Sequence, residues 1–255
     1  MIKLGMCADI TRINEVADIG FDYIEPALSK IAAMTDDEFA RAVALADDSS
    51  IKAEAFNVML PGEIKIVGDE VNAQAIHEYL DRALPRAKRL GCKVVVFGSG
   101  RSRGVPEGFD TGVAWRQIGN FLRMAQRHAL ENDIVIAIEP LRNVECNIIN
   151  YVSEATLMAS LIQMSQIGVL GDTYHMAMGG ESFSSLKMAG QLLKHIHVAN
   201  AIGRVFPKPG DGERSADLFK ALKEANYQGR VSVEGGCKDF ASEAPLAYKA
   251  LNEYR

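Results

Sequence analysis

Short runs rich in β-branched and apolar residues alternate with longer helical patterns eight times along the chain. The expected strands cover residues 2–6, 22–28, 51–58, 93–98, 134–139, 167–172, 195–199 and 230–234. The expected helices cover residues 11–20, 35–50, 69–91, 111–132, 150–165, 183–191, 215–227 and 241–254. Several strands are nearly continuous apolar runs, which is typical of parallel strands buried on both faces. Eight such units predict parallel strands that close into a (β/α)₈ TIM barrel.

The length of the chain agrees with this architecture. Its 255 residues are close to the roughly 250 of a typical barrel, and no segment has the composition of a linker. We therefore expect one domain over residues 1–255. An open doubly wound sheet is the rival architecture, but it needs a glycine-rich phosphate turn after an early strand. The turn MCADITRI (6–13) contains no glycine.

Composition narrows the classes of partner. The formal net charge of -5 argues against a broad nucleic-acid surface. The sequence shows neither a signal-peptide pattern nor the roughly 18 uninterrupted apolar residues of a membrane span. The four cysteines are far apart, so we expect small packed residues rather than disulfides, and a cytoplasmic location. They are Cys7, Cys92, Cys146 and Cys237. A small-molecule partner is expected, and a homo-oligomer is left open.

The last four expected strands end on residues that can bind a metal ion. The fifth strand ends at Glu139, the sixth at Asp172 and the eighth at Glu234, while the seventh carries His195 and His197. In a parallel barrel these ends converge, and bare carboxylates so close would raise one another's pKa. A divalent cation relieves this repulsion. The alternative is that each residue forms an ordinary ion pair at the barrel mouth.

We predict a metal site from Glu139, Asp172, His197 and Glu234. His197 is preferred over His195 because it is nearer the carboxyl end of its strand, and His195 should lie deeper on the same face. Oxygen-rich ligands with one nitrogen suit Mn²⁺ first, with Mg²⁺, Co²⁺ and Zn²⁺ as alternatives. The remaining mid-helix histidines, His77 and His128, are expected in solvated positions.

Two loops supply further candidates at the mouth. Loop 98–109 carries Arg101 and Arg103, which either hold a phosphate or carboxylate or belong to a solvated loop. Loop 58–69 is expected to be a lid or a subunit contact, and its possible pocket residues are Glu63 and Lys65. Lys208 is a further basic residue expected near the mouth. No glycine-rich phosphate cup follows the last strands beyond Gly235 and Gly236, which favours an unphosphorylated or carboxylate-bearing substrate.

Four segments of the C-terminal half carry a family resemblance. EPLRNVECNIIN (139–150), GDTYHM (171–176), HIHVAN (195–200) and VEGG (233–236) are similar to motifs of the sugar isomerase and epimerase superfamily with the xylose-isomerase-like barrel. The chain most resembles its ketose 3-epimerases, the D-tagatose and D-psicose 3-epimerases. The layout of the whole barrel fits this superfamily. Its motifs are specific for the superfamily but not for one substrate.

The resemblance also implies roles for individual residues. Glu139 and Glu234 would act both as metal ligands and as the acid/base pair. The other implied ligands are Asp172 and His197. The implied substrate contacts are Glu145, His175 and Arg204.

The chemistry implied is proton abstraction beside a carbonyl through an enediolate, on a small keto-sugar or related polyol. Return of the proton to the opposite face gives epimerisation, and return to the neighbouring carbon gives isomerisation. The alternative is a lyase or dehydratase that eliminates a group from a keto-inositol or 3-oxo-glycoside. An endonuclease for abasic sites is disfavoured, because it needs a cluster of three metal ions with more histidine and acidic ligands. This chain has only five histidines, and two of them lie in the middle of helices. A non-catalytic sugar-binding subunit is the remaining hypothesis.

Overall fold

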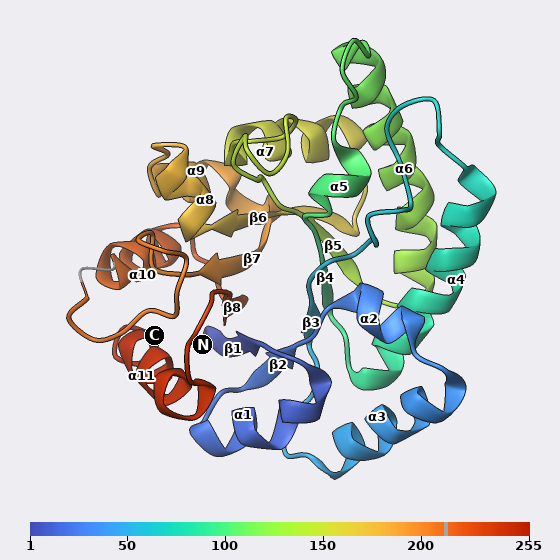
Figure 1. Cartoon of the computed structure of the whole chain (residues 1–255). Coiled ribbons are helices and arrows are strands. Elements are labelled where there is room, and N and C mark those ends of the chain that lie inside the picture. Colours follow the sequence, from blue (N-terminus) through green and yellow to red (C-terminus); the bar gives the residue numbers. More distant parts are fainter. Residues whose placement is uncertain (212–213) are drawn as a thin grey trace.

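Eight parallel strands form one sheet that curls around a central axis in the computed structural model of the chain, which describes residues 1–211 and 214–255 (Figure 1). The strands are β1 (Lys3–Cys7), β2 (Tyr23–Glu25), β3 (Ala55–Phe56), β4 (Val94–Phe97), β5 (Val135–Ile138), β6 (Ile167–Asp172), β7 (Leu193–Val198) and β8 (Arg230–Val233). Their spatial order is β2-β1-β8-β7-β6-β5-β4-β3, so neighbours in sequence are neighbours in the sheet. This is the predicted (β/α)₈ barrel.

The barrel closes between β2 and β3 through isolated bridges. The Ile24 amide donates to the Lys52 carbonyl at 3.1 Å, and the Leu28 amide donates to the Asn57 carbonyl at 2.8 Å. One of these hydrogen bonds lies within β2 and the other just beyond its carboxyl end, so together they join the two edges of the sheet. The two strands are therefore held parallel without a continuous ladder.

The two strands at the seam are shorter than the sequence indicated. Strand structure covers only three residues of the segment 22–28 and two of the segment 51–58. Pro26 directly follows Glu25 and has no amide hydrogen, so a regular ladder cannot continue through it. Beyond these points the backbone is irregular until Leu28 begins α2, and the apolar Val58 at the end of the second segment is exposed.

Helices surround the sheet on its outer side (Figure 1). They are α1 (Ile13–Ile19), α2 (Leu28–Ala33), α3 (Asp36–Asp48), α4 (Ala73–Leu90), α5 (Gly100–Arg103), α6 (Thr111–Glu131), α7 (Val152–Ile162), α8 (Thr173–Met178), α9 (Ser184–Ala189), α10 (Ser215–Glu224) and α11 (Phe240–Asn252). Two 3₁₀ turns, η1 (Ile10–Arg12) and η2 (Gly190–Leu192), join them. Across the described ranges, no helix is long and apolar enough to cross a bilayer.

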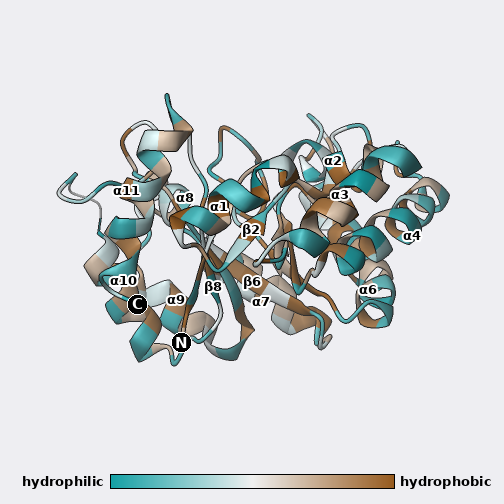
Figure 2. Cartoon of the chain, turned by 90° about the horizontal axis from the view of Figure 1, so that it is seen from below, coloured by the Kyte–Doolittle hydropathy of each residue, from teal (hydrophilic) through white to brown (hydrophobic). Residues whose placement is uncertain are grey.

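Local sequence signals explain several helix ends. The Glu38 amide donates to Thr35 Oγ1 at 3.3 Å, and the Thr35 amide donates to Glu38 Oε2 at 2.8 Å, which forms a capping box at the start of α3. Gly91 ends α4 with a φ of 107°, a conformation that favours glycine. The longer helices, among them α3, α4 and α11, carry both apolar and polar residues, as expected for elements with one buried face (Figure 2).

Side chains of the strands pack on both faces of the sheet. A small inner cluster fills the barrel below its mouth, and it consists of Tyr23, Ala55, Val94, Val96, Ala137 and Leu170. The Tyr23 ring lies over Gly5, where a Cβ atom would come within 2.2 Å of the ring. Tyr23 Oη is also 2.7 Å from Ser232 Oγ, so its polar end is satisfied inside the barrel. This packed layer forms the floor on which the polar site rests.

The prediction for the mid-helix histidines was wrong. His128 on α6 is buried, and His77 on α4 is half-buried. His77 Nδ1 lies 2.9 Å from His128 Nε2, and His128 Nδ1 lies 3.0 Å from Asp81 Oδ1. These helices pack side by side, so each imidazole faces the neighbouring helix and is shielded from solvent by it.

Candidate metal centre and substrate cleft

The four predicted ligands stand at the carboxyl ends of four consecutive strands. Glu139 directly follows β5, Asp172 ends β6, His197 is the penultimate residue of β7, and Glu234 directly follows β8. Asp172 and His197 are partners in the register of β6 and β7. The Glu234 amide donates to the Val198 carbonyl at 2.9 Å, which extends the pairing of β7 and β8 by one residue. Parallel strand ends meet at one rim, so the four side chains converge.

The donor atoms of these four residues face one another. His197 Nδ1 lies 3.4 Å from Glu139 Oε1, 4.0 Å from Asp172 Oδ2 and 3.5 Å from Glu234 Oε2. One donor atom of each residue lies within 4.8 Å of all the others. Within the described part of the chain, the Glu139, Asp172 and His197 atoms are buried without a hydrogen-bond partner. Buried polar atoms are normally partnered, so these residues fit a divalent cation.

A buried carboxylate that the sequence analysis missed orients His197. Glu25, the last residue of β2, is fully buried. Its Oε1 lies 2.9 Å from His197 Nε2, and its Oε2 lies 2.8 Å from His195 Nε2 and accepts from Ser232 Oγ at 2.5 Å. A proton on His197 Nε2 satisfies Glu25 and leaves the Nδ1 lone pair directed at the candidate ligands. His195 lies deeper than His197, as predicted.

The electrostatics of the pocket reflect crowded negative charge. Burial, reinforced by Glu139 and Glu234, raises the pKa of Asp172 to about 6. Burial alone would lower the pKa of His197, but the carboxylates of Glu25 and Glu234 outweigh it and raise that pKa well above its usual value. The protein without a cation thus holds a proton on His197, and a cation must displace it.

Two of the predicted substrate contacts, Glu145 and His175, lie beside the guanidinium of the third, Arg204. Arg204 Nη2 donates to Glu234 Oε2 at 2.9 Å, and Arg204 Nη1 lies 3.3 Å from Glu145 Oε2. Arg204 Nη2 is also 3.4 Å from His175 Nε2. The other nitrogen of that imidazole, Nδ1, accepts from the Arg142 amide at 3.2 Å. Arg204 therefore links the candidate ligand Glu234 to the two other predicted substrate contacts.

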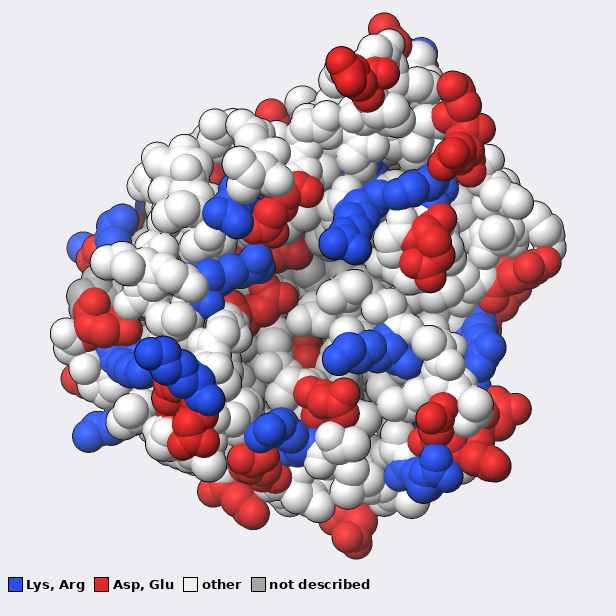
Figure 3. Space-filling model, viewed as in Figure 1, with Lys and Arg blue, Asp and Glu red and all other residues white. Residues whose placement is uncertain are grey.

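A cleft of about 500 Å³ lies over the candidate ligands. Its lining includes Glu139 and Glu234, the predicted contacts Glu145 and Arg204, and also Arg101. Figure 3 shows acidic side chains gathered around a central depression of this face, with basic side chains around its rim. The cleft is large enough for a molecule of monosaccharide size, and its walls combine polar side chains with apolar ones such as Leu60 and Leu141.

The backbone around Glu139 depends on two neighbours. Arg103 was placed at the mouth by the sequence analysis, but its side chain is fully buried. Its Nη1 donates to the Phe97 carbonyl at 2.8 Å, and its Nη2 donates to the Glu139 carbonyl at 2.6 Å. Gly98 makes room for the carboxylate, because a Cβ there would lie 2.2 Å from Glu139 Oε2. Arg103 is buried because the carbonyls at these strand ends match its donors.

Three other loop residues stand away from the cleft. Lys208 Nζ lies 2.8 Å from Glu243 Oε2 and is held by that ion pair. Lys65 Nζ donates to the Arg101 carbonyl at 2.9 Å and so fixes the backbone of the neighbouring loop. Neither Lys65 nor Glu63 is among the residues that line the cleft. Loop 58–69 therefore meets the cleft through other residues.

Comparison with known proteins agrees with the fold and the strand-end motifs. Residues 13–253 match the model of the Xylose isomerase-like TIM barrel family. A D-psicose 3-epimerase of Agrobacterium fabrum is 27% identical over 232 residues, which cover 87% of this chain and 77% of that protein. This relative is named as an epimerase and is therefore an enzyme, which agrees with the prediction that this chain is an enzyme.

Solved structures share the architecture at lower identity. The 3-keto-D-glucoside 4-epimerase of Escherichia coli has a TM-score of 0.85 at 19% identity and covers 99% of this chain and 100% of its own. The D-psicose 3-epimerase of Clostridium cellulolyticum H10, solved with D-tagatose, has a TM-score of 0.87 at 19% identity and covers 99% of both chains. At such identities these likenesses show the fold.

Proposed function

Because the chain belongs to the xylose isomerase-like TIM barrel family, we propose that it is a divalent-metal-dependent epimerase of a small keto-sugar. One observation carries this proposal. Three buried donor atoms, on Glu139, Asp172 and His197, face one another without hydrogen-bond partners in the described structure. The names of the relatives, D-psicose 3-epimerase and 3-keto-D-glucoside 4-epimerase, support a keto-sugar as the substrate.

Glu139, Asp172, His197 and Glu234 would hold the cation. Three carboxylates and one imidazole favour Mn²⁺, with Mg²⁺, Co²⁺ and Zn²⁺ as alternatives. A cation bound there would polarise a substrate carbonyl and stabilise the negative charge that develops on its oxygen. His197 would bind through Nδ1, because Glu25 occupies its Nε2 at 2.9 Å.

Glu139 and Glu234 are suited to move the proton. They lie 3.4 Å and 3.5 Å from the same nitrogen of His197, and they come from strands that flank the two other ligand strands. A planar enediolate seated over the pocket would present one face to each carboxylate. One glutamate removes the proton from the carbon beside the carbonyl, and the other returns a proton to the opposite face. The configuration of that carbon is thereby inverted.

The remaining cleft residues are suited to orient the sugar. Arg204 and His175 would donate to substrate oxygens, and Glu145 would accept from a hydroxyl. Arg101 lines the outer part of the cleft, where it would meet the distal end of the substrate. Because no glycine-rich cup accompanies Arg101 and Arg204, the cleft favours a hydroxyl or carboxylate over a phosphate.

The proposal is tested by deuterium uptake and by two matched variants. The wild-type protein, loaded with Mn²⁺, is incubated in D₂O with D-fructose, D-psicose, D-tagatose and 3-keto-glucosides. Solvent deuterium should enter the carbon next to the carbonyl, and the epimer should accumulate. Glu139→Gln and Glu234→Gln, assayed with excess Mn²⁺, should each lose at least about 100-fold in turnover, because an amide cannot accept the proton. Glu131→Gln, an exposed position at the end of α6, is the control.

Two outcomes would overturn parts of this proposal. Near-wild-type turnover in both metal-saturated glutamine variants would exclude the two-glutamate mechanism. A product that has lost a substituent, instead of an epimer, would replace epimerisation with the elimination reaction of a lyase.

A further inference from the structure

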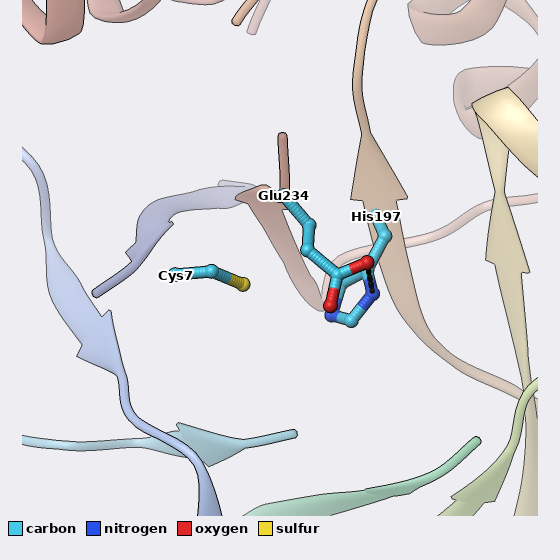
Figure 4. Close-up of side chains that lie close together, drawn as sticks. All are labelled: Cys7, His197 and Glu234. Atoms are coloured by element: carbon cyan, nitrogen blue, oxygen red, sulfur yellow. Dashed lines mark ion pairs between the residues drawn. The ribbon is translucent and has the colours of Figure 1, made fainter. Parts of the chain in front are cut away.

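A cysteine thiol lies beside the candidate cation site, close to its ligands His197 and Glu234. Cys7 ends β1, and the pairing of Met6 with Val233 brings it next to Glu234. Figure 4 shows the Cys7 side chain pointing toward His197 and Glu234. The Cys7 sulfur and one donor atom each of His197 and Glu234 all lie within 4.8 Å of one another.

We propose that Cys7, His197 and Glu234 form a second, sulfur-containing donor set that binds thiophilic divalent ions such as Cd²⁺ and Zn²⁺. This inference rests on the cation pocket of the proposed function, because both donor sets use His197 and Glu234. The oxygen-rich set suits hard ions, whereas a thiolate selects soft ones. Two ions cannot share the same two ligands at full coordination, so the sets exclude each other.

The geometry requires only small adjustments. Tetrahedral zinc with sulfur at about 2.3 Å and nitrogen at about 2.0 Å places these two donors about 3.6 Å apart. Donor atoms that now lie within 4.8 Å of one another reach this spacing through side-chain shifts of about 1 Å. Binding exchanges the sulfur–hydrogen bond for a sulfur–metal bond and also displaces the extra proton of His197, so one proton from the thiol and one from the imidazolium pass to water.

The two donor sets predict different behaviour for hard and soft ions. Mn²⁺ should not coordinate the Cys7 sulfur, because the three carboxylates and the imidazole of the other donor set suit this ion better. Cd²⁺ should be drawn toward β1, away from Glu139 and Asp172. Cd²⁺ and Mn²⁺ should therefore compete for one pocket while contacting different atoms.

The test is a titration of the metal-free full-length protein with Cd²⁺. The wild-type protein should develop a thiolate-to-cadmium charge-transfer absorption in the ultraviolet, and the ¹¹³Cd resonance should show sulfur ligation. Cys7→Ser should abolish the absorption and weaken Cd²⁺ binding by at least about tenfold, with Mn²⁺ affinity unchanged within about twofold. Cys237→Ser, which removes an exposed thiol, should keep the absorption. Cys7→Ala is the second variant if the serine protein does not fold.

Each outcome decides between the two proposals. Absence of the charge-transfer absorption and of the sulfur-ligated ¹¹³Cd resonance in a wild-type protein that binds Mn²⁺ overturns the sulfur site and leaves the proposed function standing. An absorption that persists in both Cys7 variants also overturns the sulfur site. A wild-type protein that binds neither ion overturns both proposals. The ¹¹³Cd measurement needs no variant, so it decides the question even if substitution at Cys7 is not tolerated.

Discussion

Asp172→Asn should stabilise the protein when no divalent cation is present and abolish its stabilisation by Mn²⁺. Asp172 is 1% exposed, and its Oδ2 has no hydrogen-bond partner in the described structure. Burial, with Glu139 and Glu234 nearby, raises its pKa from 3.8 to about 6. At neutral pH the ionised Asp172 carboxylate therefore destabilises the folded protein, and a bound cation would remove that destabilisation.

The sign and size of the effect follow from linkage. The pKa of Asp172 is higher in the folded than in the unfolded protein, so ionisation opposes folding. The penalty is absent well below pH 3.8, grows between 3.8 and about 6, and is complete at neutral pH. A difference of about two units corresponds to about 3 kcal/mol. The asparagine oxygen can still accept from the His175 amide, while its unpaired amide hydrogens cost about 1–2 kcal/mol. The net gain should be about 1–2 kcal/mol.

Chemical denaturation at pH 7 measures this directly. In chelator at pH 7, Asp172→Asn should be more stable than the wild-type protein, and this advantage should fall to zero near about pH 5 and reverse toward pH 4, because the ionisation penalty disappears while the cost of the asparagine amide remains. With Mn²⁺ at about 100 times its dissociation constant, the wild-type protein should gain about 2.7 kcal/mol and the variant almost nothing. The order of stability thus inverts. Asp18→Asn, at an exposed position on α1, should change stability by less than about 0.5 kcal/mol in either condition. A variant that is less stable than the wild-type protein in chelator, or that keeps the gain from Mn²⁺, would refute the reasoning.

Two further predictions concern His197 and its partner. The pKa of His197 is raised well above its usual value, and that of Asp172 is raised to about 6. The Mn²⁺ dissociation constant should therefore rise on acidification, by about tenfold per pH unit above pH 6, where one proton competes, and by up to about 100-fold per unit below pH 6, where two compete. A dissociation constant that does not change with pH, measured by electron paramagnetic resonance, would contradict this. Glu25→Gln should weaken Mn²⁺ binding by about 10–100-fold while every direct ligand is retained, and calorimetry that shows unchanged affinity would argue against the orienting role of Glu25.

The barrel and the convergence of the candidate ligands could be predicted because both depend on regular patterns. Alternation of apolar strands and amphipathic helices specifies the repeating unit. Parallel strands then bring their carboxyl ends to one rim, whatever the detailed packing. Residues such as Asp172 and Glu234 lie at positions that the strand pattern alone locates. Their proximity was therefore accessible before any coordinate was known.

The errors arose where burial depends on a partner distant in sequence. Arg103 was expected either to hold an anion at the mouth or to lie in a solvated loop, because nothing local indicates that three backbone carbonyls will meet its guanidinium. His77 and His128 lie on different helices, and each pattern alone resembles a solvated face. Their contact at 2.9 Å exists only because α4 and α6 pack together. Single-element periodicity contains no information on such pairs.

Glu25 did have a sequence signal, which lies in the tripeptide Ile-Glu-Pro. This tripeptide stands at the end of the second strand at 24–26 and recurs at the end of the fifth strand at 138–140. The two glutamates nevertheless differ in what they meet. Glu25 lies 2.9 Å from Nε2 of His197, whereas Glu139 lies 3.4 Å from Nδ1 of the same ring. Once a cation has displaced the extra proton of His197, the neutral imidazole has one N–H and one lone pair, so it can satisfy a carboxylate on one side only. The N–H satisfies Glu25, and the lone pair leaves Glu139 to be satisfied by a cation. The role of each glutamate is therefore set by the side of His197 on which barrel closure places it.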